Sequence, residues 1–254
     1  MGRRLAAALV LLGAAPLLAS CRPSTIDLAF TPTAGARYSY RYEIEATVTQ
    51  SLDGAAPSVT ELRTTLLADQ EVVEVSAGGV RAKVTLQREG GAPRTAEVRL
   101  DRAGVLQGVD LIEGQPTGIF GLEDLGGVLP TATVPDGQLA PGDRWSIDDE
   151  EVVGSGRLVR LGVIDGEDVA VVGSELTQPL DETTPIAGTT AALEGELRAT
   201  GTTAYDLRDG SLRRATTRAR GVVQARIAPP PGIDAGAVLG EITYDIRVRV
   251  TRLG

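Results

Sequence analysis

The segment YSYRYEIEATV, residues 38–48, alternates strictly between apolar and polar side chains. The segment ITYDIRVRV, residues 242–250, has the same period of two near the C-terminal end of the sequence. Successive side chains of a β-strand point to opposite faces of a sheet, so this pattern puts one face on a core and the other in water. Both segments are therefore predicted to be long, half-buried strands.

Shorter alternating runs fill much of the sequence between these two segments. The runs cover residues 80–86, 193–207 and 223–227. Glycine-containing turn signals separate them, at residues 77–79, 90–91, 101–104, 165–166 and 209–210. Strands joined by short turns pair antiparallel, so the sequence predicts a mainly β protein, built as a curved antiparallel sheet or half-barrel. The best helix signal covers residues 119–128, and we expect a short central helix there.

A short phrase recurs in the sequence at a spacing of 107 residues. The residues GARY at 35–38 align with GDRW at 142–145, and the same spacing carries Leu100 onto Leu207, each just before a turn. Two matches at one spacing predict a single β-rich domain, residues 35–254, made of two related halves at about 35–115 and 135–254. The alternative is that turns of similar chemistry coincide by chance.

Residues 1–20 have the three zones of a secretory signal. Arg3 and Arg4 give a positive start, residues 5–15 are mostly apolar, and small residues precede Cys21. The apolar stretch is shorter than the roughly 20 residues that span a bilayer. We therefore expect export, with cleavage between Ser20 and Cys21.

The tetrad Leu18-Ala19-Ser20-Cys21 resembles the lipobox of bacterial lipoproteins. This resemblance implies that lipid is attached to the Cys21 thiol, that residues 21–34 form a lipidated start and a short tether, and that the anchored protein faces the periplasm or the cell exterior. Cys21 is the only cysteine in the chain, and a lone free thiol is unusual in an exported protein. The alternative is an ordinary secreted protein in which Cys21 is incidental.

The composition excludes several kinds of chemistry. The chain has no histidine, which removes Ser-His-Asp and Cys-His catalysis and imidazole metal sites, and lipidation of Cys21 would remove thiolate chemistry. The only lysine, Lys83, falls at an outward position of an alternating run, and the acidic run at residues 148–151 is interpreted as a solvated turn. A glycosidase pair would lack the aromatic platforms of a sugar cleft, because Trp145 is the only tryptophan. We therefore expect no enzyme activity, no cofactor and no metal site.

The charge of the chain bears on its partners. The formal net charge is −9, and the basic residues form no cluster in the sequence. An acidic protein of this kind is a poor candidate for binding nucleic acid. The expected partners are instead the membrane, through the N-terminal lipid, and a lipid ligand or another envelope protein.

Four tyrosines form the candidate ligand-facing set. Tyr38, Tyr40 and Tyr42 are spaced by two and therefore share one sheet face, and Tyr244 has the same place in the last alternating segment. Their phenol rings could line a pocket and bind a headgroup by hydrogen bonds. The alternative, which we favour, is that these rings pack in the core.

The leader, the phrase GARYSY at 35–40, the phrase LAPGDRW at 139–145 and the phrase YDLRDG at 205–210 together resemble a family of uncharacterised bacterial lipoproteins. More distantly, the layout is similar to the lipoprotein-carrier group that includes LolA, LprG and LppX. That resemblance implies a curved antiparallel sheet around a short helical plug, with an apolar pocket for acyl chains. The chain departs from the carriers in its few aromatic residues and weak helix signals.

Two functions are supported as hypotheses. The first is a lipid-anchored module that binds a lipid or another apolar ligand on the concave face of its sheet. The second is an envelope structural or interaction protein, with no small-molecule ligand, whose sheet face or edge docks another protein. Both place the protein outside the cytoplasm.

We predict that the substitution Cys21→Ala releases the protein from the membrane. Without the thiol no acyl chain can be attached, and each buried methylene of such a chain contributes roughly 0.8 kcal/mol to membrane binding. Fractionation of cells that express the unchanged and the substituted chain measures this. Full retention of the Cys21→Ala protein in the membrane fraction would contradict the anchor.

Overall fold

The computed structural model describes residues 25–53, 55–102, 104, 106–113, 134–135, 137–148, 152–186, 189–229, 232 and 236–254. These residues form strands, turns and loops, and none of them lies in a helix, so they include no apolar helix long enough to cross a bilayer. The leader with Ser20 and Cys21, and the helix expected at 119–128, lie outside the described residues.

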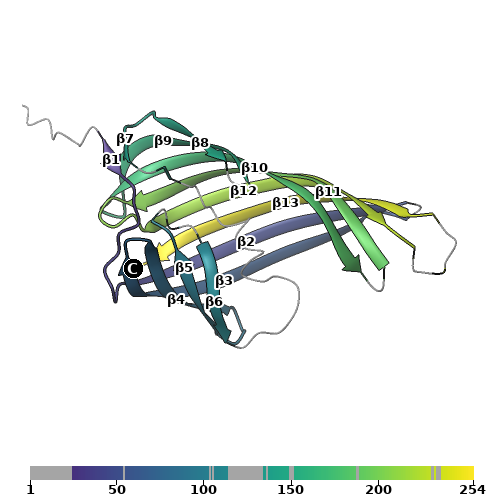
Figure 1. The fold of residues 1–254 in the computed structure, drawn as a ribbon, viewed down its shortest axis with the longest axis horizontal. Coiled ribbons are helices and arrows are strands. Elements are labelled where there is room, and N and C mark those ends of the chain that lie inside the picture. Colours follow the sequence, from purple (N-terminus) through teal and green to yellow (C-terminus); the bar gives the residue numbers. More distant parts are fainter. Residues whose placement is uncertain are drawn as a thin grey trace, which may run out of the picture.

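The described strands form one large sheet and one small one (Figure 1). The large sheet has 11 strands, all paired antiparallel, in the order β6-β5-β4-β3-β2-β13-β12-β11-β10-β9-β8. Their bounds are β2 Arg37–Leu52, β3 Ser58–Ser76, β4 Gly79–Arg88, β5 Arg94–Leu100, β6 Leu106–Glu113, β8 Arg144–Asp148, β9 Val153–Ile164, β10 Glu167–Ile186, β11 Thr189–Asp206, β12 Leu212–Ile227 and β13 Val238–Leu253. The small sheet pairs β1, Ile26–Asp27, with β7, Gln138–Leu139.

The order of the strands shows two meanders that meet in the middle. One runs outward from β2 to β6, the other runs inward from β8 to β13, and β2 pairs with β13 at the centre. The mainly β fold class and the antiparallel meander are confirmed. The two segments whose alternation is strictest are the two strands that meet.

The half-barrel predicted from the sequence is not what the described residues form. The sheet is open, with β6 and β8 as its two edges, and it is neither closed nor strongly curled. Alternation determines which residues share a face, but it carries no information on how far a sheet bends. Here β8 and β6 are 5 and 8 residues long, whereas the central strands β2 and β13 have 16 each, so the short edges extend along only part of the sheet.

The register of β2 and β13 separates an apolar face of the sheet from a polar face. Tyr42 lies opposite Val250, and Ile44 lies opposite Val248. Between these pairs, Glu43 lies opposite Arg249 on the other face. Side chains of directly paired residues lie on the same face of a sheet, so each face continues from strand to strand.

The core lies on the apolar face at the end of the sheet where both the first described residues and the C-terminus lie (Figure 1). Two segments outside the large sheet cover this end. Ile26, Leu28, Val134 and Leu139 pack on buried residues of β9, β10 and β11, and Phe30 packs on buried residues of β2, β3, β12 and β13. We call this part of the molecule the covered end.

The two sequence phrases that echo each other make the same backbone contacts. The Gly35 N–H donates to the Val72 carbonyl at 2.8 Å, and the Val72 N–H donates to the Ala36 carbonyl at 2.9 Å. The Gly142 N–H donates to the Leu158 carbonyl at 2.7 Å, and the Leu158 N–H donates to the Asp143 carbonyl at 3.0 Å. The local geometry thus agrees at these two places, and the division into two related halves stays a prediction.

The residues that follow these contacts extend the likeness. A register shift follows Val72 in the β3–β4 pairing and Leu158 in the β9–β10 pairing. The extra residues are Val73 and Val159, which are 45% and 46% exposed, whereas Val72 and Leu158 are buried. A bulge adds one residue to a strand and so restarts its alternation.

Residues 29–31 are held between two turns, one from each meander. The Phe30 N–H donates to the Arg102 carbonyl at 2.5 Å, and the Thr31 N–H donates to the Asp209 carbonyl at 2.8 Å. Gly210, in the second turn, has φ of +70°, and a Cβ there would lie 2.3 Å from the Ala29 carbonyl oxygen. Gly210 is therefore required both by its backbone conformation and by the close approach of residue 29.

We predict that Gly210→Ala destabilises the fold more than Gly35→Ala. Both glycines have a positive φ, but a Cβ at Gly35 would have no atom within 4 Å. The left-handed conformation alone costs a non-glycine residue roughly 1–2 kcal/mol, and overpacking adds roughly 1–3 kcal/mol at Gly210. The free energy of unfolding in denaturant measures both variants. Equal losses would show that residue 29 moves aside at no cost.

Candidate functional site

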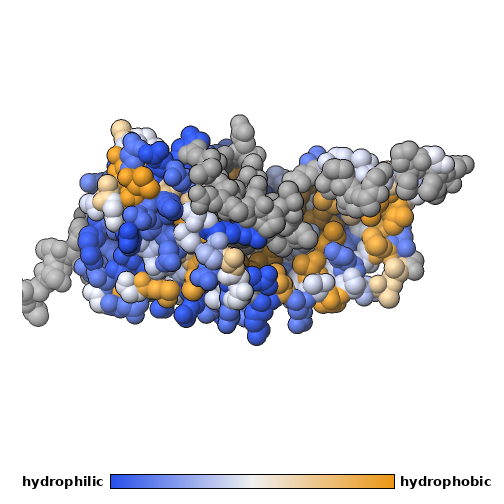
Figure 2. Space-filling model, turned by 90° about the horizontal axis from the view of Figure 1, so that it is seen from below, coloured by the Kyte–Doolittle hydropathy of each residue, from blue (hydrophilic) through white to orange (hydrophobic). Residues whose placement is uncertain are grey.

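The apolar face of the large sheet continues beyond the covered end. Toward the far ends of the long strands, the apolar side chains on this side of the sheet are partly or well exposed. We call this region the open apolar face. Its side chains are Ala46, Val48, Leu62, Leu66, Leu193, Leu197, Ile242, Tyr244 and Ile246. Ala46 lies opposite Leu62 on one side and Ile246 on the other, so three strands present adjacent apolar side chains. Figure 2 shows hydrophobic residues gathered at this end of the molecule.

The four candidate tyrosines lie on the apolar face of the sheet, and two of them are buried while the other two are half-buried. Tyr38 and Tyr40 are 3% and 6% exposed and belong to the buried cluster of the covered end, whereas Tyr42 and Tyr244 are half-buried. The ring of Tyr40 lies 6.5 Å from the rings of both Tyr38 and Tyr42. The positions of Tyr38 and Tyr40 agree with core packing. Tyr244 belongs to the open apolar face and Tyr42 lies next to it, and their role toward a ligand stays a prediction.

Burial extends to higher pH the range in which these phenols stay protonated. It raises the pKa of Tyr42 to about 12, and it also raises the pKa of Tyr244. Burial, and to a smaller extent the hydrogen bond to Asp209, raises the pKa of Tyr38 above its ordinary value. A tyrosine hydroxyl is neutral at neutral pH even without such a shift, so each ring can donate a hydrogen bond.

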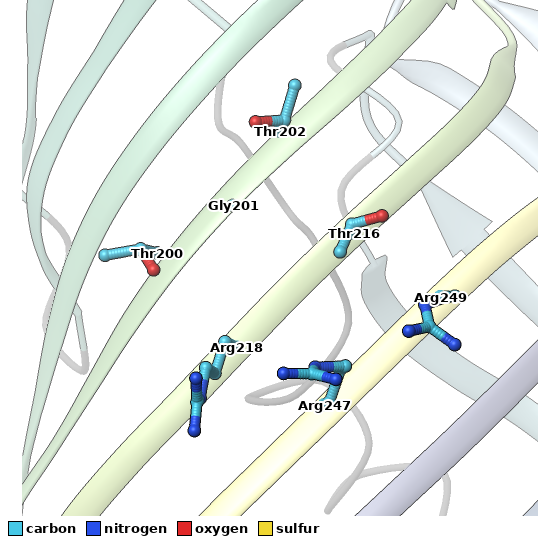
Figure 3. Close-up of a pocket in the computed structure, with 7 residues that line it drawn as sticks. All are labelled: Thr200, Gly201, Thr202, Thr216, Arg218, Arg247 and Arg249. Atoms are coloured by element: carbon cyan, nitrogen blue, oxygen red, sulfur yellow. The ribbon is translucent and has the colours of Figure 1, made fainter.

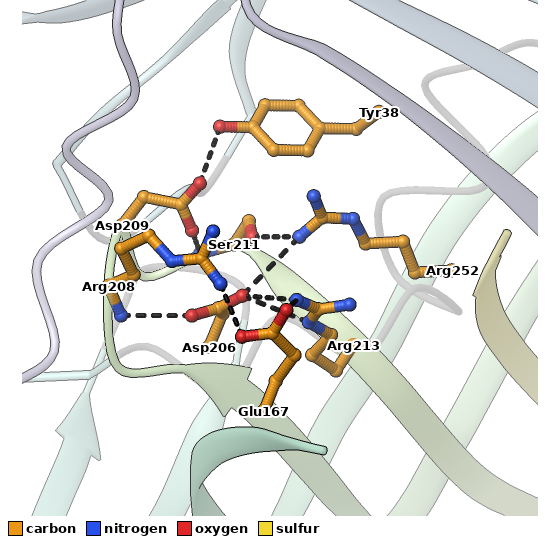
Figure 4. A network of polar contacts seen from close by, with 8 residues as sticks. All are labelled: Tyr38, Glu167, Asp206, Arg208, Asp209, Ser211, Arg213 and Arg252. Carbon is orange, nitrogen blue, oxygen red and sulfur yellow. Dashed lines mark hydrogen bonds and ion pairs between the residues drawn. The ribbon is translucent and has the colours of Figure 1, made fainter. Parts of the chain in front are cut away.

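A network of charges around one buried aspartate closes the covered end (Figure 4). Its centre is Asp206, whose side chain is 4% exposed. The Arg213 Nε and Nη2 groups donate to Asp206 Oδ2 at 2.9 and 2.7 Å, and the Arg208 backbone N–H donates to Oδ1 at 2.9 Å. Arg252 Nη1 lies 3.6 Å from the same Oδ2. The carboxylate is therefore enclosed by donors from the β11–β12 hairpin and from the last strand.

Tyr38 joins this network through Asp209. The Tyr38 hydroxyl donates to Asp209 Oδ2 at 2.8 Å, and the Ser211 backbone N–H donates to Oδ1 at 2.9 Å. Burial by itself would raise the pKa of Asp209, but the hydrogen bonds from Ser211 and Tyr38 and the charge of Arg252 lower it below its ordinary value. Arg252 also lies over the Tyr38 ring, with its guanidinium carbon 4.7 Å from the centroid, which is a favourable cation–π position.

The network ties the β11–β12 hairpin to β2 and to the end of β13. Its carboxylate oxygens are occupied by donors within the chain, and it includes no histidine or cysteine. The phrase at 205–210 stands out in the sequence, but its role could not be predicted there because Arg213 and Arg252 lie outside it. The only local sequence signal of this network is an Asp-containing turn that Arg213 follows by three residues.

The other residues considered from the sequence lie apart from this network. Lys83 is exposed in β4, and Trp145, at the start of β8, packs partly buried on the core cluster of the covered end. Of the acidic run, Asp148 ends β8 and residues 149–151 lie outside the described residues. Within the described part of the chain, no group of three or more His, Cys, Asp or Glu side chains is placed to hold a metal ion.

The fold and this face define the class of the protein: its described residues are all-β, and their open antiparallel sheet has one face that is apolar beyond its covered core. Comparison with known proteins adds no family to this description, since no protein-family model and no curated protein matches the chain.

We predict that Asp206→Asn destabilises the protein far more than Asp245→Asn. Each aspartate holds an arginine fork, but Asp206 is 4% exposed with Arg213 at 15%, whereas Asp245 is 41% exposed. Removal of one partner from a buried pair leaves an uncompensated charge and costs roughly 3–5 kcal/mol, whereas exposed pairs contribute little. Denaturant unfolding measures both free energies. Similar losses in the two variants would contradict the anchoring role of Asp206.

Proposed function

We propose that the protein is an exported, lipid-anchored and non-catalytic lipoprotein whose open apolar face binds the acyl chain of a lipid or another apolar ligand. One observation carries the proposal: the apolar series of the long strands continues past the covered end, and there its side chains are partly or well exposed. Leu62, in the middle of this series, is 37% exposed.

An apolar ligand is expected to bind this face because leaving such a surface in water costs free energy. Covering apolar area gains roughly 25 cal/mol per Å², and a contiguous exposed apolar patch marks a site of interaction. An acyl chain gains the same energy, because its methylenes also leave water. Neutral phenols at Tyr42 and Tyr244 would stand beside the chain and could bind its polar head.

The expected anchor lies at the opposite end from this face. The described structure begins at Thr25, at the covered end, and Cys21 is four residues before it (Figure 1). Four residues span at most roughly 14 Å. In the proposal, the covered end lies near the membrane and the open apolar face extends away from it, as a module that exchanges lipid with another carrier would need.

The proposal is in keeping with the resemblance to the lipoprotein-carrier group, in which an antiparallel sheet holds acyl chains. The open, weakly curled sheet is the main departure from that group. The same exposed face would also suit an envelope protein as partner. Identifying the molecules that co-purify with the protein from its membrane distinguishes a lipid ligand from a protein partner.

We expect native mass spectrometry of the full chain, extracted from its own membrane in mild detergent, to show non-covalently bound lipid. Leu62→Glu should lower the bound fraction at least several-fold, because a carboxylate in an acyl-chain site loses its hydration. Leu67→Glu is the matched control: Leu67 lies on the same strand and is 39% exposed, but it pairs with Arg41 on the polar face.

The outcomes of this experiment are distinct. Lipid bound to the unchanged protein and to Leu67→Glu, but not to Leu62→Glu, supports the proposal. A preparation that carries no lipid overturns it. If a second protein is retained in place of lipid, and is lost only in Leu62→Glu, the open apolar face docks a protein partner and the lipid-binding proposal is wrong.

A further inference from the structure

The polar face of the sheet contains an open, shallow hollow of about 450 Å³ over β11, β12 and β13 (Figure 3). It is lined by Thr200, Gly201, Thr202, Thr216, Arg218, Arg247 and Arg249. The charged lining residues are three arginines, and the other side chains that line it are threonines. The hollow lies on the face opposite the open apolar face, so a ligand bound in it would be independent of the proposed function.

The register of the strands places two of these arginines directly against each other. Arg218 on β12 lies opposite Arg247 on β13, and Figure 3 shows the Arg247 side chain extending toward Arg218. Like charges directly opposite each other in an antiparallel pair destabilise it. Thr216 and Arg249 form the next pair on the same face. The arrangement therefore has an electrostatic cost that an anion bound over the two arginine side chains would lower.

The nearby carboxylates compensate these charges only in part. Arg218 donates from Nε and Nη2 to Asp245 at 3.0 and 2.6 Å. The ion pair of Arg247 with Glu45 is 4.0 Å long and that of Arg249 with Glu43 is 3.9 Å, both beyond hydrogen-bonding distance. Arg247 and Arg249 are also 40% and 47% exposed. Their N–H groups are thus within reach of a ligand.

The same carboxylates are shared with further arginines. Glu45 also pairs with Arg63 at 3.5 Å, and Asp245 also pairs with Arg220 at 3.3 Å. Five arginines thus share three carboxylates, those of Glu43, Glu45 and Asp245. These eight side chains together carry an excess of two positive charges, on a chain whose net charge is −9.

We propose that Arg218, Arg247 and Arg249, with the hydroxyls of Thr202 and Thr216, form a binding site for a phosphate group. Guanidinium forks match the geometry of phosphate oxygens, and threonine hydroxyls add neutral donors. The phosphate can belong to a free phosphate compound or to a phospholipid headgroup, since both present the same oxygens.

Titration calorimetry of the full chain in neutral detergent, at low ionic strength, tests the site with inorganic phosphate. We expect saturable binding that weakens at least tenfold in the double variant Arg247→Gln with Arg249→Gln. Thr216→Val, which leaves the charge unchanged, should weaken binding roughly threefold. Arg63→Gln is the matched control, because Arg63 pairs with the same Glu45 but lies outside the hollow, and its affinity should stay within twofold of the unchanged protein.

A stability measurement separates binding from folding. Phosphate should raise the unfolding temperature of the unchanged protein and of Arg63→Gln, but not that of the double variant. Without phosphate, the double variant should be at least as stable as the unchanged protein, because the repulsion between Arg218 and Arg247 is gone. A double variant that is less stable without phosphate would mean that these arginines serve the fold, and would overturn the proposal.

A second titration identifies the source of the phosphate. Short-chain phosphatidylglycerol below its micelle concentration offers the headgroup, and phosphatidylcholine of the same chain length offers a zwitterionic one. Binding of either inorganic phosphate or phosphatidylglycerol that is lost in the double variant supports the site and names its ligand. No saturable binding of any of the three, or equal losses in Arg63→Gln and the double variant, overturns it.

Discussion

The pairing of β2 with β13 is the contact on which the rest of the sheet depends. It joins 14 residue pairs, from Leu52 with Gly240 to Ser39 with Leu253, between strands that lie almost at the two ends of the described chain. Without it the two meanders would be separate sheets, each with a long unpaired edge. Because its register sets which side chains share a face, this one pairing joins the apolar faces of the two meanders, which form the core and the open apolar face. A contact between such distant segments carries a large loop-closure cost, so we expect it to form late in folding.

The alternation of residues 38–48 and 242–250 was enough to predict these two strands and their shared apolar face. It could not predict the curvature, because bending depends on twist and on what covers the sheet. It also could not separate Tyr38 and Tyr40 from Tyr42 and Tyr244. All four lie on one face, and the difference in burial comes from Phe30 and its neighbours, which reach the sheet from outside the alternating segments. Periodicity in the sequence shows which side chains share a face of the sheet. Which of them are buried depends on the segments that pack on that face.

The polar contacts were harder to foresee for the same reason. The phrase at residues 205–210 stands out in the sequence, yet the arginine partners of Asp206 come from β12 and from the end of the last strand. In the hollow, Arg218 and Arg247 are separated by a hairpin whose length does not reveal its register, so their juxtaposition appears only once the strands are paired. Bulges add to the difficulty, because Val73 and Val159 each shift the alternation by one residue.

The hydrogen bonds of residues 29–31 have a mechanical consequence. A pull on the chain ahead of Thr25 first loads the β1–β7 pair. It then reaches the large sheet through Phe30, bonded to Arg102 in one meander, and Thr31, bonded to Asp209 in the other. The load therefore divides between the two halves of the sheet at neighbouring residues, and neither hairpin has to bear it alone. A protein tethered at its N-terminus to a moving membrane would transmit tension into an edge hairpin, β5–β6, and an inner hairpin, β11–β12, at the same time.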